Sequence, residues 1–139
     1  MSYTVDACVI ARWFIPGEEY EDRALKIKDK YAKGEIELYA PTLIVYEVLN
    51  VIWKAFRAGK IDFKDAIAYC QEFKRISPKI VEISRIEKVL EIAIKEDITA
   101  YDSSYILAAM QTNTPLVTSD DRLYEKAAKY VKTIHLKEI

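Results

Sequence analysis

Four carboxylates of this chain stand beside apolar segments, where a charge needs a partner: Asp6, Glu47, Asp102 and Asp120. Asp6 and Asp120 follow short strand-like runs, Glu47 interrupts an apolar helix pattern, and Asp102 precedes another one. An unpaired charge out of water costs several kcal/mol or is lost by titration, and the sequence places few lysines or arginines beside these acids. A bound divalent metal ion would compensate them, so a metal site is the first hypothesis about function.

Glu47 is the acid that an ordinary surface position explains least. In the predicted helix 41–58, the residues three and four positions away from Glu47 are three aliphatic side chains and Asn50, and residues at these spacings share one helix face. A solvated glutamate would lie on the opposite face. We therefore predict that Glu47 and Asn50 lie on or beside the core-facing stripe, with an ordinary boundary glutamate as the alternative.

The remaining acids have a competing explanation as helix caps, because aspartate at a helix N-terminus accepts hydrogen bonds from free backbone N–H groups. Asp6, Asp102, and Asp120 or its neighbour Asp121 each stand where a predicted helix begins. For each acid alone, a cap is a sufficient explanation. Their joint position at helix starts along one expected edge of a sheet favours a shared site.

The available ligand types predict which metal would bind. The chain has one histidine, His135, and two cysteines, Cys8 and Cys70, which are too few for a zinc site within one chain. We expect His135 to be structural and the cysteines to be small buried residues. Carboxylate oxygens suit Mg²⁺ or Mn²⁺, which activate water and stabilise a leaving oxygen. The chemistry that fits is hydrolysis of a phosphodiester.

These acids must be positioned by an alternation of strands and helices along the chain. The predicted strands are short and mostly β-branched or apolar, namely Tyr3–Asp6, Glu37–Tyr39, Lys79–Ile83, Leu116–Thr118 and Lys132–Leu136. The predicted amphipathic helices are 7–14, 19–33, 41–58, 62–75, 86–95, 102–110 and 122–129. Strands separated by helices predict an α/β fold with a five-stranded parallel sheet and helices on both faces. Ligands of such sheets bind beyond the carboxyl ends of the strands, which is where Asp6 and Asp120 stand.

Length and composition limit the other possibilities. A chain of 139 residues with 51% hydrophobic residues predicts one domain, 1–139, with a substantial core. The net charge of −1 gives no overall basic field for nucleic-acid binding, although a local basic patch would suffice. We expect no membrane span and a cytoplasmic location, because no apolar run is long enough and no signal peptide is evident. Abundant Lys, Glu and Ile with few Gly are typical of heat-adapted proteins, so we expect a thermophilic source.

Four segments in order resemble PIN-domain ribonucleases, and among them the VapC toxins of toxin–antitoxin pairs. They are Tyr3-Thr4-Val5-Asp6-Ala7-Cys8-Val9-Ile10, Pro41-Thr42 through Glu47 to Asn50, Thr99-Ala100-Tyr101-Asp102-Ser103-Ser104-Tyr105, and Leu116-Val117-Thr118-Ser119-Asp120. The resemblance implies sheet order 3-2-1-4-5 and a metal site of Asp6, Glu47, Asp102 and Asp120, supported by Thr118 and Asn50. Asp121 doubles the last acid, and the Thr-x-Asp spacing favours Asp120. Cys8 stands where the family usually has serine or threonine.

By the same resemblance, the activity would be Mg²⁺-dependent (or Mn²⁺-dependent) endonucleolytic cleavage of single-stranded RNA. The expected partners are an RNA substrate, a VapB-like antitoxin whose tail covers the acidic groove, and a second copy of the chain in a homodimer. Arg12, Lys54 and Arg122 are candidates for contacts to RNA phosphates, with solvated surface charges as the alternative. Four aromatic residues of the helices 41–58 and 62–75 would belong either to a dimer interface or to the core, namely Trp53, Phe56, Tyr69 and Phe73.

Three other functions are compatible with parts of this pattern. One is a non-catalytic PIN-like module that only binds proteins, against which the retained acids argue. Another is a housekeeping RNA-processing nuclease. The third is a phosphatase-like or receiver-like domain, but the former needs an acid at the position of Cys8 and the latter needs one after the third strand, where Ile83-Ser84-Arg85 supplies none.

Overall fold

A five-stranded parallel sheet forms the centre of the molecule, with strand order β3-β2-β1-β4-β5. The computed structural model describes all residues, 1–139. The strands are β1 Ser2–Val5, β2 Glu37–Pro41, β3 Lys79–Val81, β4 Leu116–Thr118 and β5 Thr133–His135. The order 3-2-1-4-5 and the parallel α/β class are therefore confirmed. Because β1 and β4 are neighbours in the middle of the sheet, the residues that follow them emerge side by side.

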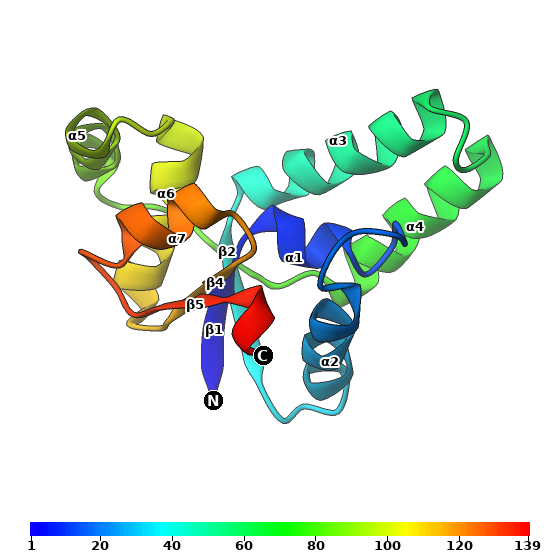
Figure 1. Ribbon diagram of the computed structural model, residues 1–139, viewed down its shortest axis with the longest axis horizontal. Coiled ribbons are helices and arrows are strands. Elements are labelled where there is room, and N and C mark those ends of the chain that lie inside the picture. Colours follow the sequence, from blue (N-terminus) through cyan, green and yellow to red (C-terminus); the bar gives the residue numbers. More distant parts are fainter.

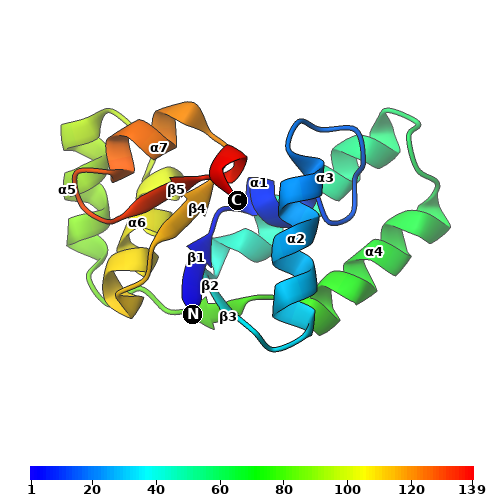
Figure 2. The same ribbon diagram turned by 60° about the horizontal axis from the view of Figure 1, so that its bottom comes forward.

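Helices cover both faces of this sheet, as expected for parallel strands joined by helical crossovers. Figures 1 and 2 show α1 to α4 on one side and α5 to α7 on the other. The helices are α1 Ala7–Ala11, α2 Glu21–Ala32, α3 Leu43–Arg57, α4 Phe63–Ile76, α5 Ile86–Glu96, α6 Ala100–Thr112 and α7 Asp121–Ala127. A short 3₁₀ helix, Leu136–Glu138, follows β5. No helix combines the length and the apolar character needed to cross a membrane.

Several predicted boundaries were wrong by a few residues. The helix expected over 7–14 ends at Ala11, because the N–H groups of Trp13 and Phe14 bond to carbonyls only three residues back, in turns. The helix expected to begin at Asp102 begins at Ala100, because Thr99 caps it. Strand β3 and strand β5 are each shorter than predicted. The error at Asp102 matters for function, because it places the acid inside the first turn.

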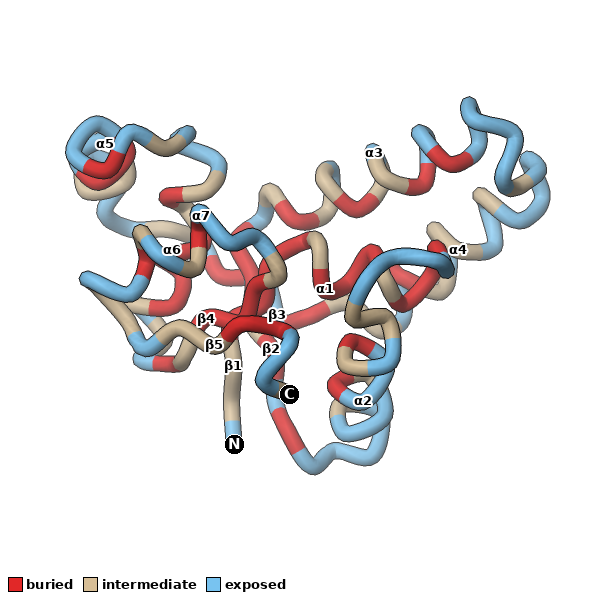
Figure 3. Tube along the Cα trace, viewed as in Figure 1, coloured by how far each residue is buried: buried red, intermediate tan, exposed pale blue.

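The core lies on both faces of the sheet, and Figure 3 shows buried residues along the strands and the facing sides of the helices. Strand residues with no exposed surface include Val5, Leu38 and Val117. Burial of both faces explains why these strands read as short apolar runs without alternation. The middle of the sheet is thus buried, and polar residues such as Asp6 and Asp120 follow its strands at the carboxyl edge.

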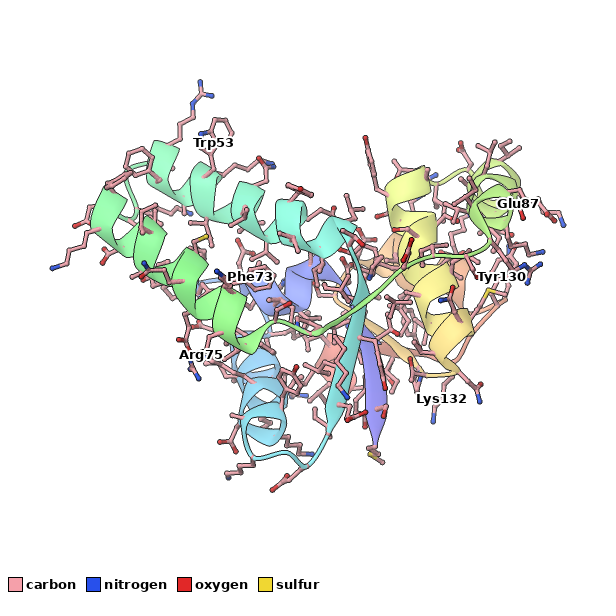
Figure 4. The ribbon with its side chains drawn as sticks, turned by 180° about the vertical axis from the view of Figure 1, so that it is seen from behind. Trp53, Phe73, Arg75, Glu87, Tyr130 and Lys132 are labelled. Atoms are coloured by element: carbon pink, nitrogen blue, oxygen red, sulfur yellow. The ribbon has the colours of Figure 1, made fainter.

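Helices α3 and α4 form a hairpin that extends beyond the sheet (Figure 1). The four aromatic residues considered for a dimer interface, Trp53, Phe56, Tyr69 and Phe73, divide between the two expected roles. Phe73 is 3% exposed and packs edge-to-face on Phe14, whereas Trp53 and Phe56 are 49% and 44% exposed. Tyr69 is half-buried. Figure 4 shows Trp53 standing out from α3 and Phe73 on the inner side of α4. The hairpin therefore has an aromatic inner side that belongs to the core and a free aromatic outer side.

Candidate active site

The four predicted acids all line one cavity of about 300 Å³ at the carboxyl edge of the sheet. Asp6 comes directly after β1, Asp120 lies two residues after β4, Glu47 is on α3, and Asp102 is on α6. The cavity is also lined by Cys8, Asn50 and Lys54. Residues from four separate parts of the chain are therefore brought together as the sequence pattern predicts. Asp6 is buried, Glu47 and Asp102 are half-buried, and Asp120 is exposed.

Asp6 is held by two short polar contacts. The Thr118 hydroxyl donates to Asp6 Oδ2 at 2.8 Å, and the Cys8 thiol donates to the same oxygen at 3.3 Å. The parallel pairing of β1 with β4 sets the first contact, because Val5 is in register with Val117. Burial raises the pKa of Asp6 above its ordinary value, and the hydrogen bonds from Thr118 and Cys8 oppose this effect. Asp6 is thus oriented, and no cation compensates its charge.

Cys8 and Cys70 are both free of any disulfide and only partly buried, so the expectation that the two cysteines are buried was wrong. The sulfur of Cys8 accepts the N–H of Ser119 at 3.4 Å. Burial, followed by the charge of Asp6, raises the pKa of the Cys8 thiol to about 12. The thiol is therefore protonated near neutral pH and acts as a weak donor to Asp6, which is the role that the hydroxyl of a serine or threonine would have.

Glu47 is positioned by a residue that the sequence analysis did not select. The Tyr105 hydroxyl donates to Glu47 Oε1 at 2.6 Å. Tyr105 is three residues after Asp102, so both lie on the same face of α6. This spacing is the signal in the sequence from which Tyr105 could have been predicted. Burial raises the pKa of Glu47, the bond from Tyr105 opposes this, and the charges of Asp6 and Asp102 raise it further.

Asp102 is not the N-cap of its helix, so that alternative is wrong. Thr99 is the cap, and its hydroxyl accepts the N–H of Asp102 at 3.0 Å. The side chain of Asp102 is left free to face the cavity. Burial, followed by the charges of Asp6 and Asp120, raises the pKa of Asp102 from 3.8 to about 6. A group that is this hard to ionise without a cation fits a cation-binding role.

Asp120 and Asp121 have separate surroundings. Asp120 lines the cavity and also caps α7, where its Oδ1 accepts the N–H of Leu123 at 2.9 Å. Asp121 does not line the cavity; its Oδ1 lies 2.9 Å from Nε2 of His135. The other ring nitrogen of His135 accepts the N–H of Lys137, so Nε2 carries the proton and donates to Asp121. The buried His135 thus holds the second acid away from the cavity.

No lysine or arginine forms an ion pair with any of the four cavity acids. Lys54 lines the cavity, but Arg12 donates to the carbonyls of Cys8 and Glu19, and Arg122 bonds to Asp97. No group of three or more acidic, histidine or cysteine side chains is arranged, as the side chains stand, so that it could hold a metal ion. An open set of carboxylates fits an ion such as Mg²⁺, which keeps several waters and shares its ligands with substrate phosphates.

Comparison with known proteins agrees with this arrangement. A family model of the PIN domain matches residues 3–129, so the chain belongs to the PIN domain family. PIN-domain nucleases are hydrolases of phosphodiester bonds and generally use divalent metal ions.

Within this class, the chain is a VapC-like nuclease. Exonuclease VapC9 of Pyrobaculum aerophilum is 33% identical over 98 residues, which cover 70% of this chain and 73% of that protein. Ribonuclease VapC3 of the same organism is 29% identical over 130 residues, which cover 91% of this chain and 95% of that protein. The crystal structure of PAE2754 from Pyrobaculum aerophilum superimposes with a TM-score of 0.74 at 28% identity, and covers 99% of this chain and 90% of that one.

Proposed function

We propose that this chain is an endoribonuclease that requires Mg²⁺ or Mn²⁺, cuts single-stranded RNA, and serves in the cytoplasm as the toxin of a VapBC-type pair. The observation that carries the proposal is the set of four carboxylates around one cavity, none of which is ion-paired with a lysine or arginine. Assembling these acids costs free energy in the absence of a cation, so their placement needs a functional reason. The PIN family match and the VapC names of two relatives give the class of reaction.

The donor set supports Mg²⁺ or Mn²⁺ over zinc. The cavity offers carboxylate oxygens and the amide of Asn50, and its one sulfur belongs to the protonated thiol of Cys8. Zinc and other soft ions prefer thiolate or imidazole ligands, whereas Mg²⁺ and Mn²⁺ prefer oxygen. Asp6, Glu47, Asp102 and Asp120 are therefore the residues that would hold the ion.

In the proposed reaction, a water oxygen attacks phosphorus, the bond from phosphorus to the 3′-oxygen breaks, and the products carry a 5′-phosphate and a 3′-hydroxyl. A bound divalent ion supplies a lower pKa for water and neutralises charge on the phosphate. The chain's own side chains fix the geometry: Thr118 and Cys8 orient Asp6, Tyr105 orients Glu47, and the start of α6 presents Asp102. Such positioning is a large part of how enzymes act on phosphate esters.

The test compares two adjacent acids. Asp120→Asn keeps an oxygen that can cap α7, since asparagine is a good N-cap, so it removes charge from the cavity with little change in fold. We expect this variant to lose metal-dependent cleavage of a single-stranded RNA panel, and Asp6→Asn to do the same. The matched control is Asp121→Asn, which should retain cleavage because Asp121 faces His135. Undiminished cleavage by Asp6→Asn and Asp120→Asn would refute the metal assignment.

We further propose that a VapB-like antitoxin inhibits this chain by covering the acidic cavity, whose uncompensated charge would attract a basic side chain. The gene directly upstream should encode a small DNA-binding protein with an amphipathic tail. Copurification of that protein with the nuclease, together with loss of RNA cleavage in the complex, is the expected result. Full cleavage by a stable complex would contradict the proposal, and cleavage with no inhibitory partner would favour a housekeeping nuclease.

A homodimer is supported by exposed apolar residues on α5. Ile86, Leu90 and Ile94 are 70%, 58% and 71% exposed, and their spacing of four places them in one stripe on the helix. A stripe of exposed apolar side chains on one helix is a candidate protein interface. We expect light scattering to give the mass of two chains, Leu90→Glu to give one chain, and Glu87→Gln on the same helix to leave the dimer intact. A monomeric wild-type protein would contradict this part of the proposal.

A further inference from the structure

Two further cavities adjoin the central cavity, because each shares lining residues with it, and we call this row of three cavities the groove. One neighbour, of about 180 Å³, shares Cys8 and Val51 with the central cavity. The other, of about 310 Å³, shares Asp102 with it. Because shared residues are walls of both spaces, the groove runs from α1 and α3, past the acids, to the start of α6. An extended strand lying in it would cross the cavity where cleavage is proposed.

The two ends of this groove differ in chemistry. The end between α1 and α3 is walled mainly by the aliphatic side chains of Ala11, Ile15 and Val51, with Arg12 and Glu18 completing it. The end at α6 is mostly polar, and Arg122 is one of its walls. An apolar space of this size is smaller than the roughly 300–1,000 Å³ of sites for drug-sized ligands, which leaves room for one flat ring system. The aliphatic end therefore suits an apolar group that enters the space while the charged backbone attached to it stays outside the space.

Arg12 is fixed at the aliphatic end. Its Nε donates to the carbonyl of Glu19 and its Nη1 donates to the carbonyl of Cys8, each at 2.7 Å. A guanidinium has five N–H donors, so these two bonds leave others to contact a phosphate. Anchoring in advance lowers the entropy cost of that contact. Arg12 therefore offers a phosphate contact beside an apolar space, and the carboxylate of Glu18 disfavours a phosphate inside the space itself.

We propose that the aliphatic end of the groove is a base subsite, which takes one unpaired nucleobase next to the cleaved bond while Arg12 binds an adjacent phosphate. The inference rests on the proposed function and adds a substrate requirement to it. Three features argue for a nucleobase: the subsite shares Cys8 and Val51 with the cavity of the acids, an anchored cation stands beside it, and its aliphatic walls can pack against a ring face. A base inside a duplex would have to leave its stack to enter, so the subsite selects single strands.

The experiment is an abasic scan. A single-stranded RNA with one cleavage site is made with the base removed at each position in turn, and kcat/KM is measured with Mg²⁺. Contacts to one base of a single strand are commonly strong enough for about a tenfold effect, so we expect about a tenfold loss at one position beside the cleaved bond. The wild-type protein and Ile67→Phe, a change at an exposed apolar residue of α4 outside the groove, should give the same profile.

The protein side of the test is Val51→Phe, which fills the subsite. Because Val51 also lines the central cavity, the readout is the ratio of kcat/KM for the intact RNA to that for the RNA lacking the base. We expect this tenfold ratio to fall to about one. Val51→Ala removes wall contact without adding bulk and should reduce the same ratio, which keeps the test usable if the larger side chain prevents folding. If kcat/KM falls by the same factor for intact and abasic RNA in both variants, the base subsite is overturned.

The outcomes separate this inference from the function on which it rests. Metal-dependent cleavage with a flat abasic scan would overturn the subsite and leave the proposed function standing. Absence of metal-dependent cleavage in the wild-type protein would overturn both. If the scan is flat and Val51→Phe instead weakens inhibition by the antitoxin, the space receives a protein side chain and the nucleobase assignment is wrong.

Discussion

Replacement of Asp102 by asparagine should stabilise the metal-free protein while it impairs metal binding. Burial and the charges of Asp6 and Asp120 raise the pKa of Asp102 from 3.8 to about 6. The folded state therefore binds the Asp102 proton more tightly than the unfolded state does. By linkage, this group makes the free energy of unfolding fall as pH rises from 3.8 through about 6. Above that range the full penalty is present, and asparagine removes it.

The magnitude follows from the pKa difference. At about 1.36 kcal/mol per pKa unit, the change from 3.8 to about 6 corresponds to an upper limit of about 3 kcal/mol. Asp102 is only half-buried, so screening by solvent reduces this to about half. Loss of a negative charge in the first turn of α6 costs roughly 0.3–1 kcal/mol. The net stabilisation is then about 1 kcal/mol at pH 7.5, or a rise in Tm of about 3 °C for a domain of this size.

The assay is thermal and urea unfolding in EDTA at pH 7.5 and again near pH 4. The matched control is Asp65→Asn, because Asp65 is the third residue of α4 as Asp102 is of α6, and in each helix the N–H of that residue bonds to the cap. Asp65 is exposed, so its variant reports the helix effect without the cavity. Added Mg²⁺ should then raise the Tm of the wild-type protein more than that of Asp102→Asn.

Two results would refute this reasoning. One is an Asp102→Asn protein that is less stable than Asp65→Asn at pH 7.5 without metal, since the cavity would then stabilise the charge. The other is a stability difference that does not shrink near pH 4, since the penalty exists only where the wild-type side chain is ionised.

Further predictions concern metal binding and stability. Metal affinity should fall below about pH 6, where Asp102 takes up a proton; calorimetric titration at pH 5 and 7.5 checks this, and a pH-independent affinity would contradict it. Tyr105→Phe removes a donor that lowers the pKa of Glu47, so Mg²⁺ affinity should fall several-fold, as for the loss of a bond worth about 1 kcal/mol; unchanged affinity would argue against Glu47 as a ligand. Asp62→Ala removes the cap of α4 and should cost about 1 kcal/mol in urea unfolding without altering RNA cleavage. Calorimetry should give a Tm above the roughly 45–65 °C of mesophilic domains, and a value within that range would contradict a heat-adapted protein.

Much of the fold and part of the site follow from local sequence patterns. The strands follow from short β-branched or apolar runs, and the helices and Glu47 on its apolar stripe follow from a periodicity of 3.6 residues. The glycine after α3, Gly59, has φ of +75°, and glycine adopts this conformation without a steric penalty. Boundaries were less well predicted, because capping depends on single side chains such as Thr99, which competed with Asp102 for the same role.

The four acids of the cavity could be predicted from the residue types and their positions in the sequence. The order of the strands was predicted only from the resemblance to a family. What tertiary structure decided were contacts between residues far apart in the chain: Thr118 on Asp6, Tyr105 on Glu47, and His135 on Asp121. No local periodicity encodes such pairs, because they depend on which strands and helices become neighbours. The same physics separates Asp120 from Asp121. Only the Thr-x-Asp spacing of a family distinguishes them in sequence, whereas in the structure β5 places the buried His135 beside Asp121.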